Sequence, residues 1–335
     1  MFSSKLGTVY LGRKGAAESH LLIVNQILRS KVDLKVVISS KNQKLKEYQQ
    51  LGIELFILEV PVNIRQLIGF FKKNVLRDLV PFLFDCNTVY FYMPHPMDNW
   101  IARALIRQKI NVIRSIHDCR RHPGDWWPTK VSIKRQIRYS SEIVAHSEFV
   151  AQRVGSSIRP IVLPLPVPKR RIKRRNITKT VLFIGRFRAY KGIDLLLEAW
   201  PKVLRVIPEA KLVLAGDGNL KKFGELTNVT IVNRWLESGE IERLIDSSSC
   251  VVFPYIEASQ SGPLSLAISA HRPVVITNVG GLMEQAAKGC YFEANFSSDS
   301  IAAAILEAIA SSFEYRNETI ENRELADYLI EKSKH

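Results

Sequence analysis

Short apolar runs alternate with longer amphipathic stretches along almost the whole chain, and this alternation constrains the fold more than any other feature of the sequence. In the first half, apolar runs typical of buried strands lie at 8–11, 34–39, 54–58, 88–92, 111–116 and 143–145. Stretches with apolar residues at helical spacing separate them, at 17–30, 42–51, 64–79 and 97–108. Because strands that alternate with helices usually pair in parallel, the pattern predicts a doubly wound α/β domain.

A proline-rich and basic segment at 160–176 interrupts the alternation. Its prolines and basic residues are Pro160, Pro164, Pro166, Pro168, Lys169, Arg170, Arg171, Lys173, Arg174 and Arg175. Neither a helix nor an inner strand tolerates this density of proline, so the segment predicts a linker. The alternation restarts at 181. We expect an N-terminal Rossmann-like domain (1–165), a linker (166–178), a second Rossmann-like domain (179–298) and C-terminal helices (299–335) that could pack back towards the first domain.

The charge of the chain is concentrated in its first half. Residues 1–178 contain 31 Lys and Arg against 12 Asp and Glu, a net charge of +19, whereas residues 179–335 contain 17 against 20, a net charge of −3. This asymmetry indicates an anionic partner for the first half: nucleic acid, an anionic membrane surface or a phosphorylated substrate. The four cysteines form no C-x-x-C pair, which argues against a zinc ribbon or a disulfide framework and fits a reducing cytosol. Since no run of about 18 apolar residues occurs, we expect no membrane-spanning helix.

The strongest chemical signal opens the second half. An apolar run ends at Gly185, and a loop with Arg186, Arg188 and Lys191 leads into a helix that begins near Gly192. Cations and free backbone N–H groups at a helix N-terminus suit a pyrophosphate. The alternative interpretation is a solvated basic loop.

Two further turns in the second half follow predicted strands. One is the glycine-rich turn at Gly216 and Gly218, which alone is a weak signal. The other follows Glu257 and leads through Ser259 to a helix at Pro263, a residue favoured at the first helical position. Such a turn can approach a sugar or phosphate closely, although it would also serve as an ordinary capped turn with Glu257 as a solvated carboxylate.

In the first half, His117 and Asp118 follow a predicted strand, and His122 and Asp125 lie in the next loop. These polar residues would face a cleft at the carboxyl end of the sheet, where ligands bind in such folds. A single histidine there is more often structural. The spacing of the four residues matches no zinc pattern, so no metal site is expected.

Together these stretches resemble the retaining glycosyltransferases of the GT-B fold, specifically sequence family 4. The resemblance is specific over 181–290, where the motifs G-R-x-x-x-x-K-G-x-D, A-G-x-G, P-x-x-E and P-V-V-x-T-x-V-G-G-x-x-E follow in order. It is looser in the first half, where 12–20 and the pair His117–Asp118 carry it. The resemblance implies two Rossmann-like domains that face each other across a cleft.

The resemblance also implies roles for individual residues. Arg186 and Lys191 would hold the diphosphate of a nucleotide-sugar, while His117 and Glu257 would contact the transferred sugar, and these four are the candidate catalytic residues. The other candidate donor-binding residues are Gly15, Gly216, Arg234, Trp235, Ser261, Gly262, Pro263 and Leu264. The resemblance further implies that no metal or other cofactor is bound, so Arg186, Lys191 and helix dipoles would stabilise the leaving diphosphate.

One position departs from the family pattern. The second glutamate of the family, which normally holds the ribose, is replaced by Ser265 when counted from Glu257, or by Leu266 when counted back from Pro273. Neither residue can bind a ribose diol as a carboxylate would. The donor is then held differently, or its binding is weakened or lost.

The basic first half contains a candidate membrane-binding helix at 64–80. Apolar residues could share one face, with Lys72, Lys73 and Arg77 beside it, as in helices that lie in a lipid surface. A packed core helix with a solvated basic face is the alternative. With Asp118, these three basic residues are the candidate acceptor or membrane contacts.

We therefore expect a hexosyltransferase, peripheral on the inner face of the cell membrane, that uses a nucleotide-diphospho-sugar. Its expected acceptor is a lipid-linked saccharide in bacterial surface polysaccharide synthesis. A non-catalytic GT-B-like membrane or assembly subunit is an alternative, because the second glutamate is missing. A nucleic-acid-binding protein is a weaker one, because Phe70 and Phe71 lie among apolar neighbours rather than on a basic sheet face.

Overall fold

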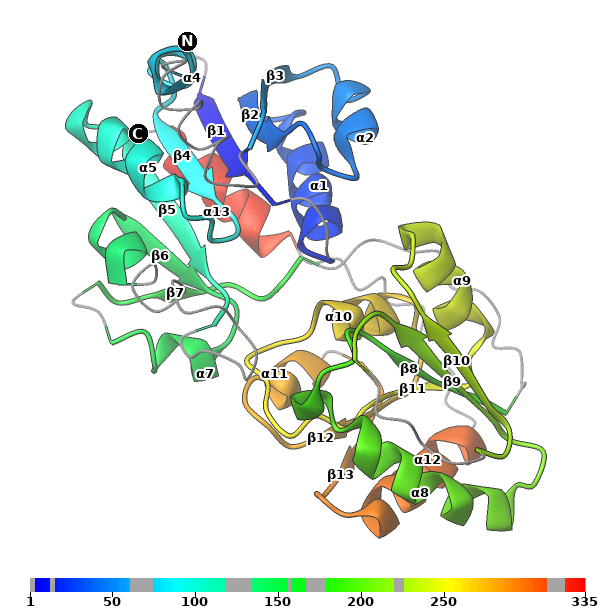
Figure 1. The fold of residues 1–335 in the computed structure, drawn as a ribbon. Coiled ribbons are helices and arrows are strands. Elements are labelled where there is room, and N and C mark those ends of the chain that lie inside the picture. Colours follow the sequence, from blue (N-terminus) through cyan, green and yellow to red (C-terminus); the bar gives the residue numbers. More distant parts are fainter. Residues whose placement is uncertain are drawn as a thin grey trace. The chain divides into compact units, whose positions relative to one another are not determined.

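The computed structural model describes residues 4–12, 16–60, 75–118, 134–155, 158–166, 179–219, 226–287, 289–311 and 323–334 (Figure 1). The chain divides into two compact units. Unit 1 comprises Met1–Pro166 together with Asn322–His335, and unit 2 comprises Val167–Glu321. The predicted linker at 166–178 lies outside the described residues except for Pro166.

Unit 1 contains a parallel sheet of seven described strands in the order β3-β2-β1-β4-β5-β6-β7. The strands are β1 (Lys5–Tyr10), β2 (Asp33–Ser39), β3 (Glu54–Leu58), β4 (Thr88–Phe91), β5 (Asn111–Ile116), β6 (Glu142–Ala145) and β7 (Ile161–Val162). The helices described in this unit are α1 (Ala16–Leu28), α2 (Leu45–Gln49), α4 (Val75–Phe82), α5 (Asp98–Arg107), α7 (Glu148–Ala151) and α13 (Glu324–Lys332).

Both faces of the unit 1 sheet are covered by apolar cores, as a doubly wound fold requires. Successive side chains of a strand point to opposite faces. In β1, Val9 accordingly packs into one core with Leu79 and Ile101, while Tyr10 packs into another with Leu21 and Val24. The prediction of a doubly wound α/β unit is thus confirmed.

The last helix of the chain completes unit 1. Helix α13 packs against α1, and its buried residues Leu325 and Leu329 join the core that contains Leu21 (Figure 1). Thr88 Oγ1 donates a hydrogen bond of 2.8 Å to the carbonyl of Lys332, which fixes the end of α13 at the first residue of β4. The sequence grouped all helices after 299 together, whereas α13 belongs to unit 1 and the preceding helix α12 (Ser298–Ala310) to unit 2.

A second parallel sheet, of six described strands in the order β10-β9-β8-β11-β12-β13, forms unit 2. The strands are β8 (Thr180–Ile184), β9 (Lys211–Gly216), β10 (Val229–Asn233), β11 (Cys250–Phe253), β12 (Val274–Thr277) and β13 (Tyr291–Ala294). A short 3₁₀ turn, η1 (Ala189–Lys191), precedes α8 (Ile193–Val206), and α9 (Ser238–Ser247), α10 (Gly262–Ser269), α11 (Leu282–Ala286) and α12 follow. Helices α8 and α12 pack against each other. Two Rossmann-like sheets in one chain are the fold that the sequence predicts.

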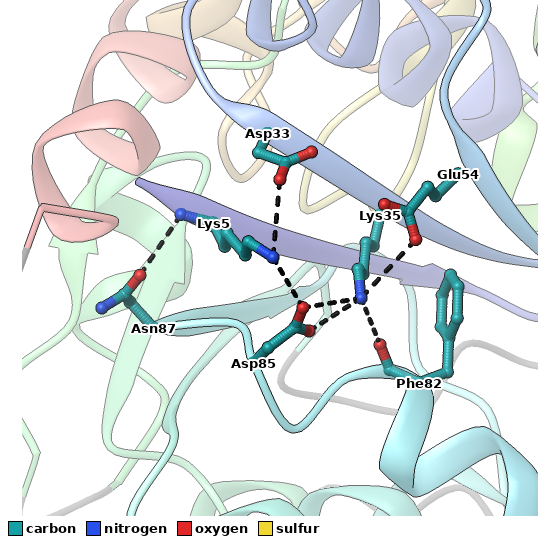
Figure 2. Close-up of polar contacts among 7 residues, drawn as sticks. All are labelled: Lys5, Asp33, Lys35, Glu54, Phe82, Asp85 and Asn87. Atoms are coloured by element: carbon teal, nitrogen blue, oxygen red, sulfur yellow. Dashed lines mark hydrogen bonds and ion pairs between the residues drawn. The ribbon is translucent and has the colours of Figure 1, made fainter. Parts of the chain in front are cut away.

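A buried lysine ties together the amino-terminal edge of the unit 1 sheet (Figure 2). Lys35 Nζ lies 2.8 Å from one carboxylate oxygen of Asp85 and donates a 3.1 Å hydrogen bond to the carbonyl of Phe82. Lys5 Nζ contacts the same carboxylate at 2.8 Å. Since a buried ammonium group is costly without a partner, Asp85 stabilises the starts of both β1 and β2. This cluster lies at the end of the sheet opposite the candidate site residues.

Candidate functional site

Two glycines bring the ends of β8 and β9 together in unit 2. A Cβ atom added to Gly216 would lie 1.8 Å from the carbonyl oxygen of Gly185, and the backbone at Gly216 has φ +155°. Only glycine permits this approach. Gly185 N donates to the carbonyl of Ala215 at 3.0 Å, so the two strand ends are hydrogen bonded as well as close. The site predicted at Gly216 therefore sits on a tight backbone corner.

The next residues of this corner are held by backbone and side-chain contacts. Gly218 forms a parallel bridge with Phe187, and the amide side chain of Asn233 both accepts from Gly218 N and donates to Gly218 O, each at 3.2 Å. Phe187 is buried and anchors the β8 loop to the core. These contacts hold the backbone at Gly218 and tie it to the end of β10.

The basic loop predicted to bind a diphosphate follows β8 directly. Arg186 and Arg188 are exposed, whereas Lys191 is half-buried, with its Nζ 3.6 Å from the centroid of the Tyr255 ring. A cation over an aromatic face is attracted by the ring, so Tyr255 helps to position Lys191. Helix α8 begins at Ile193, which places these cations on the loop that leads to its N-terminus.

The same loop is locked against the segment that follows β11. Ile256 N donates to the carbonyl of Tyr190 at 2.8 Å, and Gly192, with φ +67°, lies directly against the carbonyl of Pro254. The segment from Pro254 to Ile256 leads to Glu257, whose side chain is half-buried. The structure thus brings the loop of Lys191 and the segment of Glu257 side by side within unit 2.

The turn before α10 is capped, as its alternative interpretation from the sequence expects. Ser261 is the N-cap, and its hydroxyl accepts from Leu264 N at 3.4 Å. Gly262 and Pro263 are half-buried in the first turn of α10, whereas Leu264 is buried. The hydroxyl of Tyr255 lies 3.1 Å from Ser261 Oγ, which links this cap to the contact of Lys191.

A glutamine from α11 holds the start of α10. Gln285 Oε1 accepts from Ser261 N at 3.0 Å, while its Nε2 donates to Ser261 O at 2.7 Å and to Ser265 Oγ at 2.6 Å. Ser265 is buried, so it serves the scaffold, and Leu266 is half-buried and apolar. Gln285 was not predicted from the sequence. The one feature that could have indicated it is a long polar side chain on the short helix that follows Gly280 and Gly281.

Two of the candidate donor-binding residues, Arg234 and Trp235, directly follow β10. Arg234 N donates to Gly216 O at 2.8 Å, which places Arg234 beside the glycine corner, and Trp235 is half-buried. The guanidinium of Arg234 already binds both carboxylate oxygens of Glu240, at 3.0 and 2.6 Å. Its hydrogen bond lowers the pKa of Glu240 to about 2. Arg234 therefore also secures the first turn of α9.

In unit 1, His117 follows β5 and is buried. Its Nε2 donates to the carbonyl of Tyr92 at 2.7 Å, and burial lowers its pKa. Asp118 is half-buried beside it. Burial also lowers the pKa of His20 to about 4. At neutral pH both imidazoles are uncharged.

Several predicted residues cannot be placed. Gly15, Lys72, Lys73, His122 and Asp125 lie outside the described residues, whereas Arg77 is exposed on α4. Among the residues that the structure does describe, no group of three or more His, Cys, Asp or Glu is arranged to hold a metal ion. Within the same ranges, no helix is both long and apolar enough to cross a bilayer.

The sequence of unit 2 matches a known family. Residues 178–311 match the family model described as glycosyl transferases group 1. A protein of Methanocaldococcus jannaschii, named as an uncharacterised glycosyltransferase, is 32% identical over 123 residues. That match covers 35% of this chain and 31% of the relative, so it spans about a third of either protein.

Comparison of whole structures shows the GT-B fold. Anabaena HepE, crystallised with UDP and glucose, superposes with a TM-score of 0.66 at 17% identity, over 99% of this chain and 95% of HepE. The UDP-GlcNAc 2-epimerase of Neisseria meningitidis, bound to UDP-GlcNAc, gives 0.62 at 15% identity, over 98% of both chains. The two-domain α/β fold is therefore shared with proteins of more than one activity.

Proposed function

We propose that the protein is a glycosyltransferase that takes a sugar from a nucleotide-diphospho-sugar held by unit 2. The observation that carries this proposal is the glycine corner at Gly185 and Gly216, with Arg186 and Lys191 on the adjoining loop at the start of α8. The match to glycosyl transferases group 1 covers these residues. The UDP in the HepE crystals and the UDP-GlcNAc in the epimerase crystals support a uridine nucleotide as the first donor to test.

In this proposal each candidate residue acts on the departing diphosphate or on the sugar. Arg186 and Lys191 neutralise the negative charge that develops on the leaving diphosphate, and the N-terminus of α8 adds its dipole. Glu257 and His117 bind hydroxyl groups of the transferred sugar. We propose that transfer proceeds with retention, as the resemblance implies, and without a metal ion, because Arg186 and Lys191 can neutralise the charge of the leaving diphosphate.

The glutamate that holds the ribose in the family pattern is missing from this chain. Ser265 is engaged by Gln285 and Leu266 carries no polar group, so neither supplies a carboxylate. In this proposal Arg186 and Lys191 still bind the diphosphate. We propose weaker donor binding than a glutamate at this position would give, rather than none.

We further propose an acceptor on an anionic membrane, on its cytoplasmic side, such as a lipid-linked saccharide in bacterial surface polysaccharide synthesis. The net charge of +19 over residues 1–178 supports this. In unit 1, α5 exposes Trp100 and Ile106 together with Arg103 and Arg107, and the neighbouring α4 exposes Arg77. Apolar side chains beside basic ones suit a surface of anionic lipid.

A panel of nucleotide-sugars tests the catalytic proposal. A donor that binds the folded protein raises its stability, by about 2.7 kcal/mol at a concentration 100 times its Kd. Donors that raise the midpoint of thermal unfolding are then incubated with lipid extracts, and the products are analysed. Sugar transferred to an acceptor is the expected result. Release of an epimerised nucleotide-sugar without any acceptor would contradict the proposal.

Vesicle binding tests the membrane proposal. We expect the protein to sediment with vesicles containing phosphatidylglycerol at low salt, but not with neutral vesicles. Replacing Arg77, Arg103 and Arg107 with Gln should release it. The matched control replaces Arg205, Lys211 and Arg243, three exposed basic residues of unit 2, and should leave binding unchanged. Equal loss in both variants, or preferential binding to duplex DNA, would overturn the proposal.

A further inference from the structure

Three histidines and a tyrosine cluster at the carboxyl ends of β4, β5 and β6. The ring centroid of His117 lies 4.7 Å from that of His146 and 5.0 Å from that of Tyr92, and the rings of His146 and Tyr92 are 6.0 Å apart. His20 reaches the group from α1, and all four side chains are buried. Only His117 stood out in the sequence, because the others are distant along the chain.

Backbone carbonyls fix the tautomers of two of these rings. A carbonyl oxygen only accepts, so His117 Nε2 carries the proton in its 2.7 Å hydrogen bond to Tyr92 O. By the same argument, His146 Nδ1 donates to Leu163 O at 2.8 Å. In the neutral state, His117 therefore has its lone pair on Nδ1 and His146 has its own on Nε2. Within the described part of the chain, His146 Nε2 is buried and makes no hydrogen bond.

The surroundings oppose a positive charge on this cluster. Burial lowers the pKa of His20 and His146 and raises the pKa of Tyr92, so none of these three side chains favours a proton on His117. Tyr10 from β1 and Tyr48 from α2 lie in the same core as Tyr92. Asp118 is the carboxylate that favours a proton on His117, yet burial outweighs it and lowers the pKa of His117. The side chains that exclude water from His117 therefore keep its imidazole in the neutral form.

We propose that His146 is a positioning residue for His117. Its ring, anchored on Leu163 O, packs against the imidazole of His117, keeps water away from it and holds it as the neutral tautomer with Nδ1 as the hydrogen-bond acceptor. This rests on the proposed function, in which His117 binds a hydroxyl of the transferred sugar. A neutral acceptor at Nδ1 takes a hydrogen bond from that hydroxyl, whereas a protonated ring cannot.

Two substitutions separate the ring of His146 from its hydrogen bond. His146→Phe keeps the aromatic ring but loses the donor to Leu163 O. His146→Asn keeps an amide donor but removes the ring. If the Asn variant does not fold, His146→Gln takes its place in the experiment, because glutamine also carries an amide donor and no ring. Val150→Ala, a buried change in the neighbouring core that contains Ile116, is the control for destabilisation alone.

The first readout is the pH titration of His117 followed by NMR of the imidazole nitrogens, which needs no donor or acceptor. We expect the Asn variant to raise the pKa of His117 by about one unit, a tenfold change in its protonation equilibrium. The Phe and Val150→Ala variants should titrate like the parent. An unchanged titration in the Asn variant, or a raised one in the Phe variant, would overturn the proposal whether or not the protein transfers sugar.

The second readout is the pH profile of transfer. In the Asn variant the acid limb of the kcat/KM profile should move to higher pH by the same amount as the pKa of His117. In the Phe variant the acid limb should lie at the same pH as in the parent. A purely structural role for His146 would lower stability in both variants and leave the limb in place. If the titration shifts as expected but no transfer occurs with any donor, the proposed function fails while the positioning of His117 by His146 stands.

Discussion

Gly192 lies so close to Pro254 that a Cβ atom on it would stand 1.8 Å from the carbonyl oxygen of Pro254. The backbone at Gly192 also has φ +67°, which costs an alanine roughly 1–2 kcal/mol before any clash. Gly192→Ala should therefore destabilise unit 2 by more than that amount, as measured by denaturant unfolding. It should also displace the loop of Lys191 and weaken nucleotide binding.

The control for this substitution is Gly239→Ala. Gly239 lies in α9, is exposed, and would bring its Cβ no closer than 3.7 Å to Arg243. An alanine in a helix is favoured over glycine by about 0.5–1 kcal/mol, so this variant should be as stable as the parent or slightly more so. If the two variants were equally stable, the close contact between Gly192 and the carbonyl of Pro254 would not require glycine at position 192.

Arg186→Ala and Lys191→Ala should each weaken the binding of a nucleoside diphosphate. A hydrogen bond to a charged group contributes about 1.5–3 kcal/mol, which corresponds to a roughly tenfold to hundredfold rise in Kd. Isothermal titration calorimetry measures the change. Arg205→Ala removes an exposed cation from the last turn of α8 and should leave Kd unchanged. If both loop variants bind like the parent, the diphosphate lies elsewhere.

Glu257→Gln and His117→Ala should reduce sugar transfer far more than nucleotide binding. Both side chains are proposed to contact the sugar, so loss of their hydrogen bonds raises the barrier to transfer while the diphosphate contacts remain. Turnover of the donor and Kd for the free nucleoside diphosphate are measured in parallel. Transfer at the parent rate by both variants would move the reacting centre away from these residues.

The lysine cluster at the start of β1 and β2 predicts a pH-dependent stability. Hydrogen bonds from Lys35 and Lys5 outweigh burial and lower the pKa of Asp85 below its ordinary value of 3.8. The stabilisation is therefore fully present above about pH 4 and is lost as the pH falls through the folded-state pKa. Asp85→Asn should be less stable than the parent at pH 7, and the difference should shrink towards pH 2. Asp78→Asn, an exposed change on α4, should show no such difference.

Local patterns in the sequence predicted the fold and the glycine-rich turns of unit 2. The alternation of apolar runs predicted β1 to β6 and β8 to β12, because a buried parallel strand is apolar throughout. It did not predict β13 or the two-residue β7, which lies in the proline-rich segment that the sequence assigned to a linker. Gly185 and Gly216 stand at strand ends and Gly192 precedes α8, and at each the backbone conformation favours glycine. Pro263 likewise indicated where α10 begins, because proline is favoured in the first turn of a helix.

Contacts between distant segments were not predictable in this way. Gln285 and Ser261 are 24 residues apart, so no periodicity links them. The contact between Arg234 and Glu240, six residues along, fits neither helical nor strand spacing. The cluster around His117 combines residues from α1 and three strand ends. In each case both residues look like ordinary polar residues in the sequence, and only the fold shows that they are partners.

The place of α13 in unit 1 has a consequence for the order in which the chain matures on the ribosome. Domains generally fold as units as they emerge, the N-terminal one first. Here the core around Leu21 and Val24 is complete only when Leu325 and Leu329 have packed into it, and these two residues are synthesised after all of unit 2. Unit 2 can therefore complete its packing during translation, whereas unit 1, although it emerges earlier, is the last to close. Until then the apolar surface of unit 1 that α13 covers is exposed to solvent.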